Sequence, residues 1–287
     1  MILKNTKAAQ EFLPSLNLSL DNERLSDFFR RAQEWLVRHI IGSGLESVLE
    51  AEVGANATDS HADLRKLCQR VIAVKALADA IPEMDMQLTE AGFAVQDNDN
   101  YTPASAQRVE RLRAQLPGRI SNDTDALVNY LISGSGSGSS YAQWRNSDQF
   151  KYLTSAFMPT EEDFSKVLMA VSPGESVTYE QFYALIPGMA MEMREVADYF
   201  VGEEEINRLV NLYRQDGLNE VQRKAVARLR DVAVAACFNN AKMARNAAIR
   251  ARQVMVASPS SFTEFQHSNA SQRQEIDLDG GKTVNFL

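Results

Sequence analysis

The fold is decided by two stretches that end alike, RLSDFFRRAQEWLVRHIIG at residues 24–42 and MEMREVADYFVG at residues 191–202. In both, apolar side chains recur every three or four residues, which is the spacing of one face of an amphipathic helix. Each stretch ends in glycine, and Gly42 and Gly202 lie 160 positions apart. Glycine is common where helices end because it adopts backbone conformations that other residues avoid. Both stretches are therefore predicted to be helices that stop at a glycine.

A second apolar helix is expected after each glycine, so the helix pair occurs twice. One copy spans residues 24–80 and the other spans residues 184–241. At the same offset of 160, Ile72-Ala73-Val74 falls on Val232-Ala233-Val234. The sequence thus predicts a mainly α fold built from two similar helical-hairpin units that arose by internal duplication.

Composition divides the chain into four parts. Residues 1–132 are predicted to form an N-terminal helical unit and residues 141–257 a C-terminal one. Between them, residues 133–140 read SGSGSGSS, the composition of a flexible linker. A mobile loop and an artificial replacement of a native loop are the alternative interpretations of this stretch. The polar residues 258–287 are predicted to form an extended tail without a core of its own.

Local signals predict the ends of two further helices. Pro117-Gly118 is expected to end a polar helix that starts near Thr102-Pro103, because a proline inside a helix removes a backbone donor. A separate short helix would then cover residues 123–132. Farther on, residues 221–256 are predicted to be one helix, about 54 Å long at 1.5 Å per residue.

The bulk composition narrows the class of protein. The chain of 287 residues has a formal net charge of -8 and a pI near 5.1, whereas a general nucleic-acid-binding protein concentrates basic residues on one face. No apolar run reaches about 18 residues, so no membrane span is predicted, and no signal sequence is recognised at the N-terminus. Cys68 and Cys237 lie in apolar helical stretches and are expected to be buried thiols, which favours folding in a reducing, intracellular compartment.

Several short motifs fall short of a catalytic or binding site. Gly281-Lys282-Thr283 lacks the glycine that a phosphate-binding loop carries five positions earlier. Asp97–Asn100 alternates oxygen ligands but lacks the glycine and glutamate of a calcium-binding loop. His39, His61 and His267 have no nearby partners at metal-ligand spacing. We therefore predict no catalytic, cofactor-binding or metal-binding residues, and no enzymatic activity.

Two groups of side chains have more than one interpretation. An aromatic group is either part of the core or a recognition surface. A basic group in an Ala-rich helix is a solvated face, a contact to an acidic neighbouring subunit, or a nucleic-acid contact. The aromatic residues are Tyr141, Trp144, Phe150, Tyr152 and Phe157. The basic residues are Lys242, Arg245, Arg250 and Arg252.

A set of core and turn residues resembles a family of phage and prophage proteins. The likeness covers most of residues 1–255, and the Ser/Gly stretch departs from it. The residues that carry it are Phe12-Leu13-Pro14, Ala32, Glu34, Trp35, Ile41-Gly42, Leu45, Val48, Leu49, Gly92-Phe93, Pro103-Ala104-Ser105, Trp144-Arg145-Asn146-Ser147 and Gly202.

The family is similar to helical head-tail connector, or neck adaptor, proteins, which form a ring between portal and tail. The resemblance implies a homo-oligomeric ring that contacts portal and tail proteins in a virion assembled in the host cytoplasm. DNA would pass through such a ring without sequence-specific binding, and an acidic inner surface would repel its phosphates. The alternative function is a non-catalytic helical module that binds a partner helix or peptide between its halves.

Overall fold

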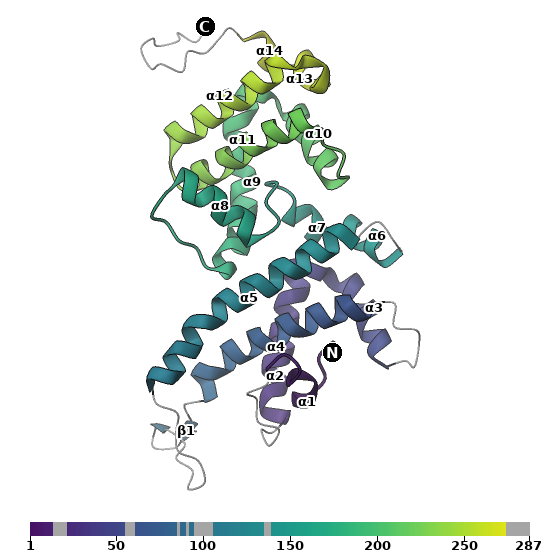
Figure 1. Ribbon diagram of the computed structural model, residues 1–287, viewed down its shortest axis with the longest axis vertical. Helices are drawn as coiled ribbons and strands as arrows, with labels where there is room; N and C mark the ends of the chain where they lie inside the picture. The colour runs from purple at the N-terminus through teal and green to yellow at the C-terminus, as the bar shows by residue number, and fades with distance from the viewer. Residues whose placement is uncertain are drawn as a thin grey trace. The chain divides into compact units, whose positions relative to one another are not determined.

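The computed structural model describes residues 1–13, 22–54, 61–84, 87–89, 92–94, 106–134 and 139–273 (Figure 1). This part of the chain is mainly helical, which confirms the predicted fold class. It divides into two compact units, Met1–Phe150 and Lys151–Leu287, and each is described by itself.

The first unit combines long helices with one short β-hairpin. Strands β1 and β2 are antiparallel and pair Gln87 with Ala94 and Thr89 with Gly92. The elements in chain order are α1 (Thr6–Ala9), α2 (Asn22–Leu36), a π-helical turn η1 (Val37–Ile41), α3 (Gly42–Gly54), α4 (Ala62–Met84), β1 (Gln87–Thr89), β2 (Gly92–Ala94), α5 (Ala106–Gly134), α6 (Ser139–Asn146) and α7 (Asp148–Leu153), whose end enters the second unit.

Helix α4 is the centre of the first unit because it packs against both α2 and α5 (Figure 1). A helix with a single neighbour buries only one face. In α4, the four consecutive residues Val71, Ile72, Ala73 and Val74 are fully buried. Four residues exceed one helical turn, so α4 is enclosed on all sides at this level.

Helix α5 continues through Pro117, which corrects the predicted helix end. The proline removes one backbone hydrogen bond, but residues 111–115 are exposed, so water reaches the carbonyl that loses its partner. On the opposite side, Leu116, Ile120, Leu127 and Leu131 are buried. Packing of this apolar side against α4 therefore outweighs the local effect of the proline.

The second unit is helical throughout its described part, and α11 lies at its centre. Helix α11 packs against α8, α9 and α12, and its residues Val232, Ala233, Val234 and Ala235 are fully buried. The elements in chain order are α8 (Glu161–Val171), α9 (Tyr179–Val201), α10 (Glu203–Arg214), α11 (Glu220–Cys237), α12 (Ala241–Ala257), a 3-10 turn η2 (Pro259–Ser261), α13 (Thr263–His267) and α14 (Asn269–Gln272).

The predicted single helix over residues 221–256 is two helices. Helix α11 ends at Cys237, and Asn239 has a φ of 57°, which an α-helix cannot contain. The side chain of Asn240 then accepts a hydrogen bond from the backbone N–H of Met243 at 3.2 Å and so caps α12. Asparagine suits both positions, because it tolerates a positive φ and is a preferred N-cap residue.

The boundary between the units differs from the predicted linker. The chain divides after Phe150, and helix covers both ends of the Ser/Gly stretch, since α5 reaches Gly134 and α6 starts at Ser139. Residues 135–138 lie outside the described residues. Trp144 belongs to the first unit because it is buried there and its Nε1 donates to the carbonyl of Ile40 at 2.8 Å.

The first half of the predicted extended tail is folded. Residues 258–273 form η2, α13 and α14, and they bury Phe262, Phe265 and Ala270 within the second unit. The two phenylalanines are spaced by three residues and supply the apolar surface that a tail without a core would lack. Residues 274–287 lie outside the described residues.

Candidate interaction surfaces

The second unit turns sharply at Gly202, between α9 and α10. Gly202 has a φ of 89° and its N–H donates to the carbonyl of Asp198 at 2.9 Å. Residues 261–273 cover this corner, and we call them its cover. A Cβ added to Gly202 would lie 3.1 Å from the Cβ of Ser268, so the cover fits closely against the glycine.

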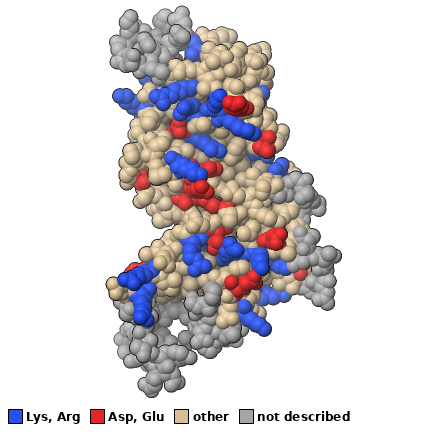
Figure 2. All heavy atoms as spheres, in the orientation of Figure 1, with Lys and Arg blue, Asp and Glu red and all other residues tan. Residues whose placement is uncertain are grey.

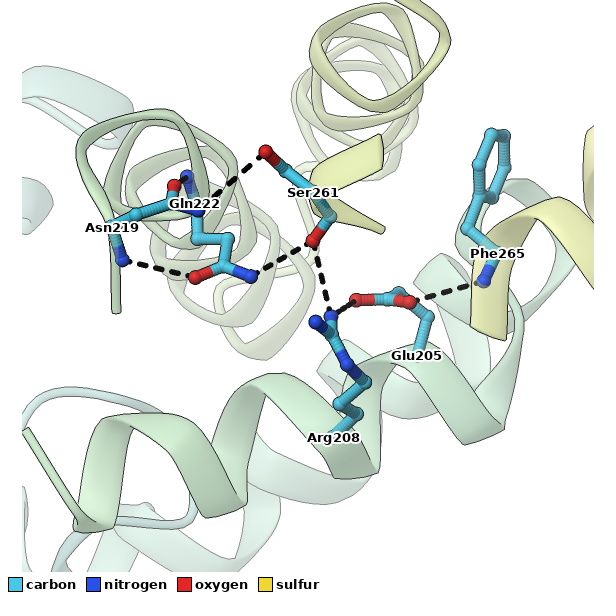
Figure 3. A network of polar contacts seen from close by, with 6 residues as sticks. All are labelled: Glu205, Arg208, Asn219, Gln222, Ser261 and Phe265. Carbon is cyan, nitrogen blue, oxygen red and sulfur yellow. Dashed lines mark hydrogen bonds and ion pairs between the residues drawn. The ribbon is translucent and has the colours of Figure 1, made fainter. Parts of the chain in front are cut away.

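A buried carboxylate joins the corner to its cover (Figure 3). Glu205, in the first turn of α10, has no exposed side-chain surface. Its Oε2 accepts the backbone N–H of Phe265 at 3.0 Å, and its Oε1 accepts Nη1 of Arg208 at 2.7 Å. Arg208 also donates to the carbonyl of Ser261 at 3.2 Å. The pair therefore satisfies backbone groups of the covering segment as well as each other.

Helix α11 holds the same segment from a second side (Figure 3). Asn219 and Gln222 cap α11 reciprocally, each side chain accepting the other's backbone N–H at 2.9 Å. The amide nitrogen of Gln222 then donates to the carbonyl of Ser261 at 2.8 Å. Two helices thus fix one turn of the cover, and this arrangement makes the corner rigid.

Burial raises the pKa of Glu205, because removal from water penalises the charged form. The N–H of Phe265 and the guanidinium of Arg208 act in the opposite direction and favour the carboxylate. Since both are short-range partners, the contact has the geometry of a structural joint rather than of an open acid. The sequence places Glu205 in a helix first turn but gives no signal of its burial.

Carboxylates line a hollow beside the corner. A cavity of about 420 Å³ is bordered by Asp198 of α9, Glu204 of α10 and Glu264 of α13, together with His267 and Arg273. A second hollow of about 430 Å³ shares Glu204 and Glu264. None of these three carboxylates forms an ion pair with a residue in the described part of the chain. We call Asp198, Glu204 and Glu264 the acidic rim.

Helices α11 and α12 carry the opposite charge. Residues 220–257 hold eight lysine and arginine residues and two carboxylates. Residues 161–214 hold four lysine and arginine residues and eleven carboxylates. Figure 2 shows lysine and arginine side chains gathered on the visible surface over α11 and α12. On α11, Lys224 pairs with Glu220 at 2.9 Å and Arg228 with Asp231 at 3.1 Å.

The exposed cations of α12 have no such partners among the residues that the structure describes. Lys242, Arg245 and Arg250 are exposed and form no ion pair with a residue that the structure describes. At 100° per residue all three lie on one half of the helix, and we call them the basic face. Val256 falls between Lys242 and Arg245 around the helix and is 53% exposed. Arg252 is buried instead and donates to the carbonyls of Ala270 and Arg273.

The other predicted groups are not part of the acidic rim or the basic face. Tyr141, Trp144, Phe150 and Phe157 are buried, so most of the aromatic group is core. Among the histidines, His267 borders the acidic cavity, His61 contacts Glu52 at 2.6 Å, and His39 lies in the π-helical turn before Gly42. Asp97–Asn100 and Gly281-Lys282-Thr283 lie outside the described residues.

Two searches of the described residues bear on the class of site. They contain no group of three or more histidine, cysteine or carboxylate side chains arranged to hold a metal ion. No described helix combines the length and the apolar character that crossing a membrane requires. Cys68 and Cys237 are free thiols, and complete burial raises the pKa of Cys68 to about 12.

A family model matches part of the chain. Residues 40–154 match a family of unknown function, DUF6712. The matched segment begins at the end of the π-helical turn, contains the Gly42 corner and ends with α7, so it lies almost wholly in the first unit. No curated protein and no solved structure matches the chain. Over this segment the chain is similar to proteins whose family name states no activity.

Proposed function

We propose that this protein is a structural subunit that assembles through its helical surfaces. More narrowly, we propose a head-tail connector or neck adaptor subunit of a phage or prophage virion, acting in a ring. The observation that carries the proposal is the basic face of α12, whose exposed cations lack described partners in a chain of net charge -8. Such cations remain available to an acidic partner, and an acidic chain offers one in its own copies.

A subunit of this kind must present its surfaces in a fixed geometry. The Glu205 joint supports that requirement, because it ties α10, α11 and residues 261–265 together through buried hydrogen bonds. A rigid presentation lowers the entropy that is lost when copies associate. The helices beside the basic face and the acidic rim are therefore held before assembly begins.

The connector assignment rests on the sequence resemblance, with charge in support. A net charge of -8 suits a protein that lets DNA pass, because an acidic surface repels phosphates. The matched family adds nothing to this assignment, since its function is unknown.

The proposal is tested by negative-stain electron microscopy of the purified protein, alone and mixed with the portal protein encoded in the same gene cluster. We expect rings, and co-sedimentation of the two proteins. Strict monomers that do not bind the portal protein would contradict the proposal. They would favour the helical interaction module instead.

A further inference from the structure

We infer that the basic face of α12 docks on a second copy of this chain, on its acidic rim and on the stripe of Met191, Glu195 and Asp198 on α9, which we call the α9 stripe. The inference rests on the proposed function, since it names the contact through which the subunits would assemble. The two surfaces share no residue, because no α12 side chain lines the acidic cavity. A contact between two different surfaces is head-to-tail, and head-to-tail contacts close into rings when the rotation allows.

The first argument is that one charge on each surface, Lys242 on the basic face and Asp198 on the acidic rim, opposes its local helix dipole. The positive end of a helix dipole favours carboxylates in the first turn, and α8, α9, α10 and α11 all have them. Helix α12 has none there and carries Lys242 instead. At the C-terminal end of a helix the dipole is negative and favours cations, but the last turn of α9 contains Asp198 and no basic residue. Neither charge stabilises its own helix, so each is better explained by a partner.

The second argument is that each surface combines charge with an exposed apolar side chain. On α12, Val256 is 53% exposed and lies on the same side of the helix as Lys242 and Arg245, about three turns beyond Arg245 toward the C-terminal end. On α9, Met191 is 61% exposed, and the spacing of four and seven residues places Glu195 and Asp198 on the same stripe. Apolar contact surrounded by charged groups is the usual composition of a protein interface.

The third argument is that the α9 stripe ends at a hollow. Asp198 borders the cavity of about 420 Å³, where Glu204 and Glu264 add two further carboxylates. The long side chain of a lysine or arginine from a neighbouring copy can enter such a hollow and meet several acceptors. Nucleic acid would use the basic face alone and would leave the acidic rim without a partner.

Charge-reversal variants distinguish docking of a second copy from binding of nucleic acid. The base-reversed variant is K242E/R245E, and the acid-reversed variant is E195K/D198K. The substitutions at 242 and 198 suit the local helix dipole, so melting temperatures should stay unchanged or rise. The matched control is R108E/R111E, which changes two exposed cations of α5 in the first unit.

The full-length proteins are compared by sedimentation velocity over a range of concentrations at low and high salt. We expect each reversed variant to associate at least tenfold more weakly than the wild-type chain, and the control to associate normally. An equimolar mixture of the two variants should regain wild-type association, because it recreates an opposite-charge contact at every junction. Raised salt should weaken association of the wild-type chain.

Two outcomes would overturn the inference. One is that both reversed variants assemble like the wild-type chain, or that the equimolar mixture of the two variants does not associate. If the protein still binds the portal protein in that case, the proposed function survives. The other is that K242E/R245E loses binding to a short DNA duplex while self-association is unaffected. A wild-type chain that remains monomeric with and without the portal protein would instead reject the proposed function itself.

Discussion

The Gly42 corner and the Gly202 corner solve the same structural problem with different covers. Gly42 has a φ of 71° and Gly202 a φ of 89°, and each joins two helices at the common offset of 160 residues. A helix that ends at such a corner leaves its last carbonyls without intrahelical donors. Each corner therefore needs later parts of the chain to supply those donors.

The covers come from unlike segments. At the first corner, Trp144 donates to the carbonyl of Ile40 at 2.8 Å, and Gln149 to that of Arg38 at 3.5 Å. At the second corner, Arg273 donates to the carbonyl of Tyr199. The first cover consists of an indole and an amide from α6 and α7, whereas the second consists of the short turns of residues 261–273. Similar corners thus do not require similar covers.

The residue three positions after each corner glycine, which we call the anchor, differs as well. Three residues after Gly42, Leu45 is 3% exposed and apolar; three residues after Gly202, Glu205 is fully buried and charged. Leucine needs only contact, while Glu205 needs the N–H of Phe265 and the guanidinium of Arg208. The first corner is therefore held by packing and the second by a buried polar network, and four experiments test this difference.

The largest effect is expected from Trp144→Ala. Trp144 is 1% exposed, so its removal leaves a large cavity and takes the donor from Ile40. We expect a loss of about 3–5 kcal/mol in the stability of the first unit. Hydrogen exchange of α2 and α3 amides should rise at least about 100-fold, since each 1.4 kcal/mol corresponds to about tenfold.

The matched variants are Trp144→Phe, which retains most of the apolar contact, and Arg273→Ala at the second corner. Both variants should lose less stability than Trp144→Ala, and neither should change hydrogen exchange in the unit that was not altered. Equal losses for Trp144→Ala and Arg273→Ala would contradict the distinction between a packed and a polar cover.

Glu205→Leu gives the second corner the same anchor residue type, leucine, that Leu45 supplies at the first corner. The N–H of Phe265 then loses its acceptor, and Arg208 loses its partner, so we expect a cost of about 2–3 kcal/mol. The readout is hydrogen exchange in residues 262–273. Glu205→Gln, which keeps one acceptor, should cost about 1 kcal/mol. A Glu205→Leu protein as stable as the wild-type chain would show that packing alone suffices at both corners.

Alanine at either glycine sharpens the comparison further. Each substitution forces a positive φ on a residue with a Cβ, at a cost of about 1–3 kcal/mol. Gly202→Ala should cost more, because Ser268 is short and its hydroxyl is bonded to the carbonyl of Phe265 at 2.7 Å. At Gly42 the added Cβ meets the end of the flexible Gln149 side chain. Urea unfolding of both variants measures the two losses of stability. A larger loss for Gly42→Ala than for Gly202→Ala would contradict the argument from Ser268.

The smallest effect is a pH dependence of opposite sign at the two corners. Burial, and then Arg38 and Lys75, lower the pKa of His39, so protonation below about 6.5 favours the unfolded state and weakens the first corner. Burial raises the pKa of Glu205, so its contribution to stability falls as pH rises above about 4.5 and through the folded pKa. Lowering the pH from 7 should therefore loosen the first corner and tighten the second.

Hydrogen exchange measured from pH 7 down to about pH 4.5, corrected for the intrinsic rate, measures both slopes. His39→Gln should remove the slope of the first corner, and Glu205→Gln that of the second. Slopes that persist in these variants would assign the dependence to other groups.

The mainly α class and both corner glycines were predictable, because apolar spacing and glycine placement are local signals. The covers were not, because Trp144 and Phe265 contact residues that lie 104 and 60 positions away in the sequence. The passage of α5 through Pro117 was missed for the same reason, since packing on α4 decides it. The basic face was visible in the sequence as a charge cluster, but the exposure of Lys242 and the burial of Arg252 required the fold.

The position of each cover along the chain also sets an order of events during synthesis. Trp144 is translated about 100 residues after Gly42, and Phe262 about 60 residues after Gly202. At about 5–20 residues per second, the first corner waits roughly 5–20 s for its cover and the second roughly 3–12 s. The apolar side chains under the first corner are thus open to chaperones for nearly twice as long. Nascent chains stalled between residues 60 and 140 should be the species that chaperones bind best.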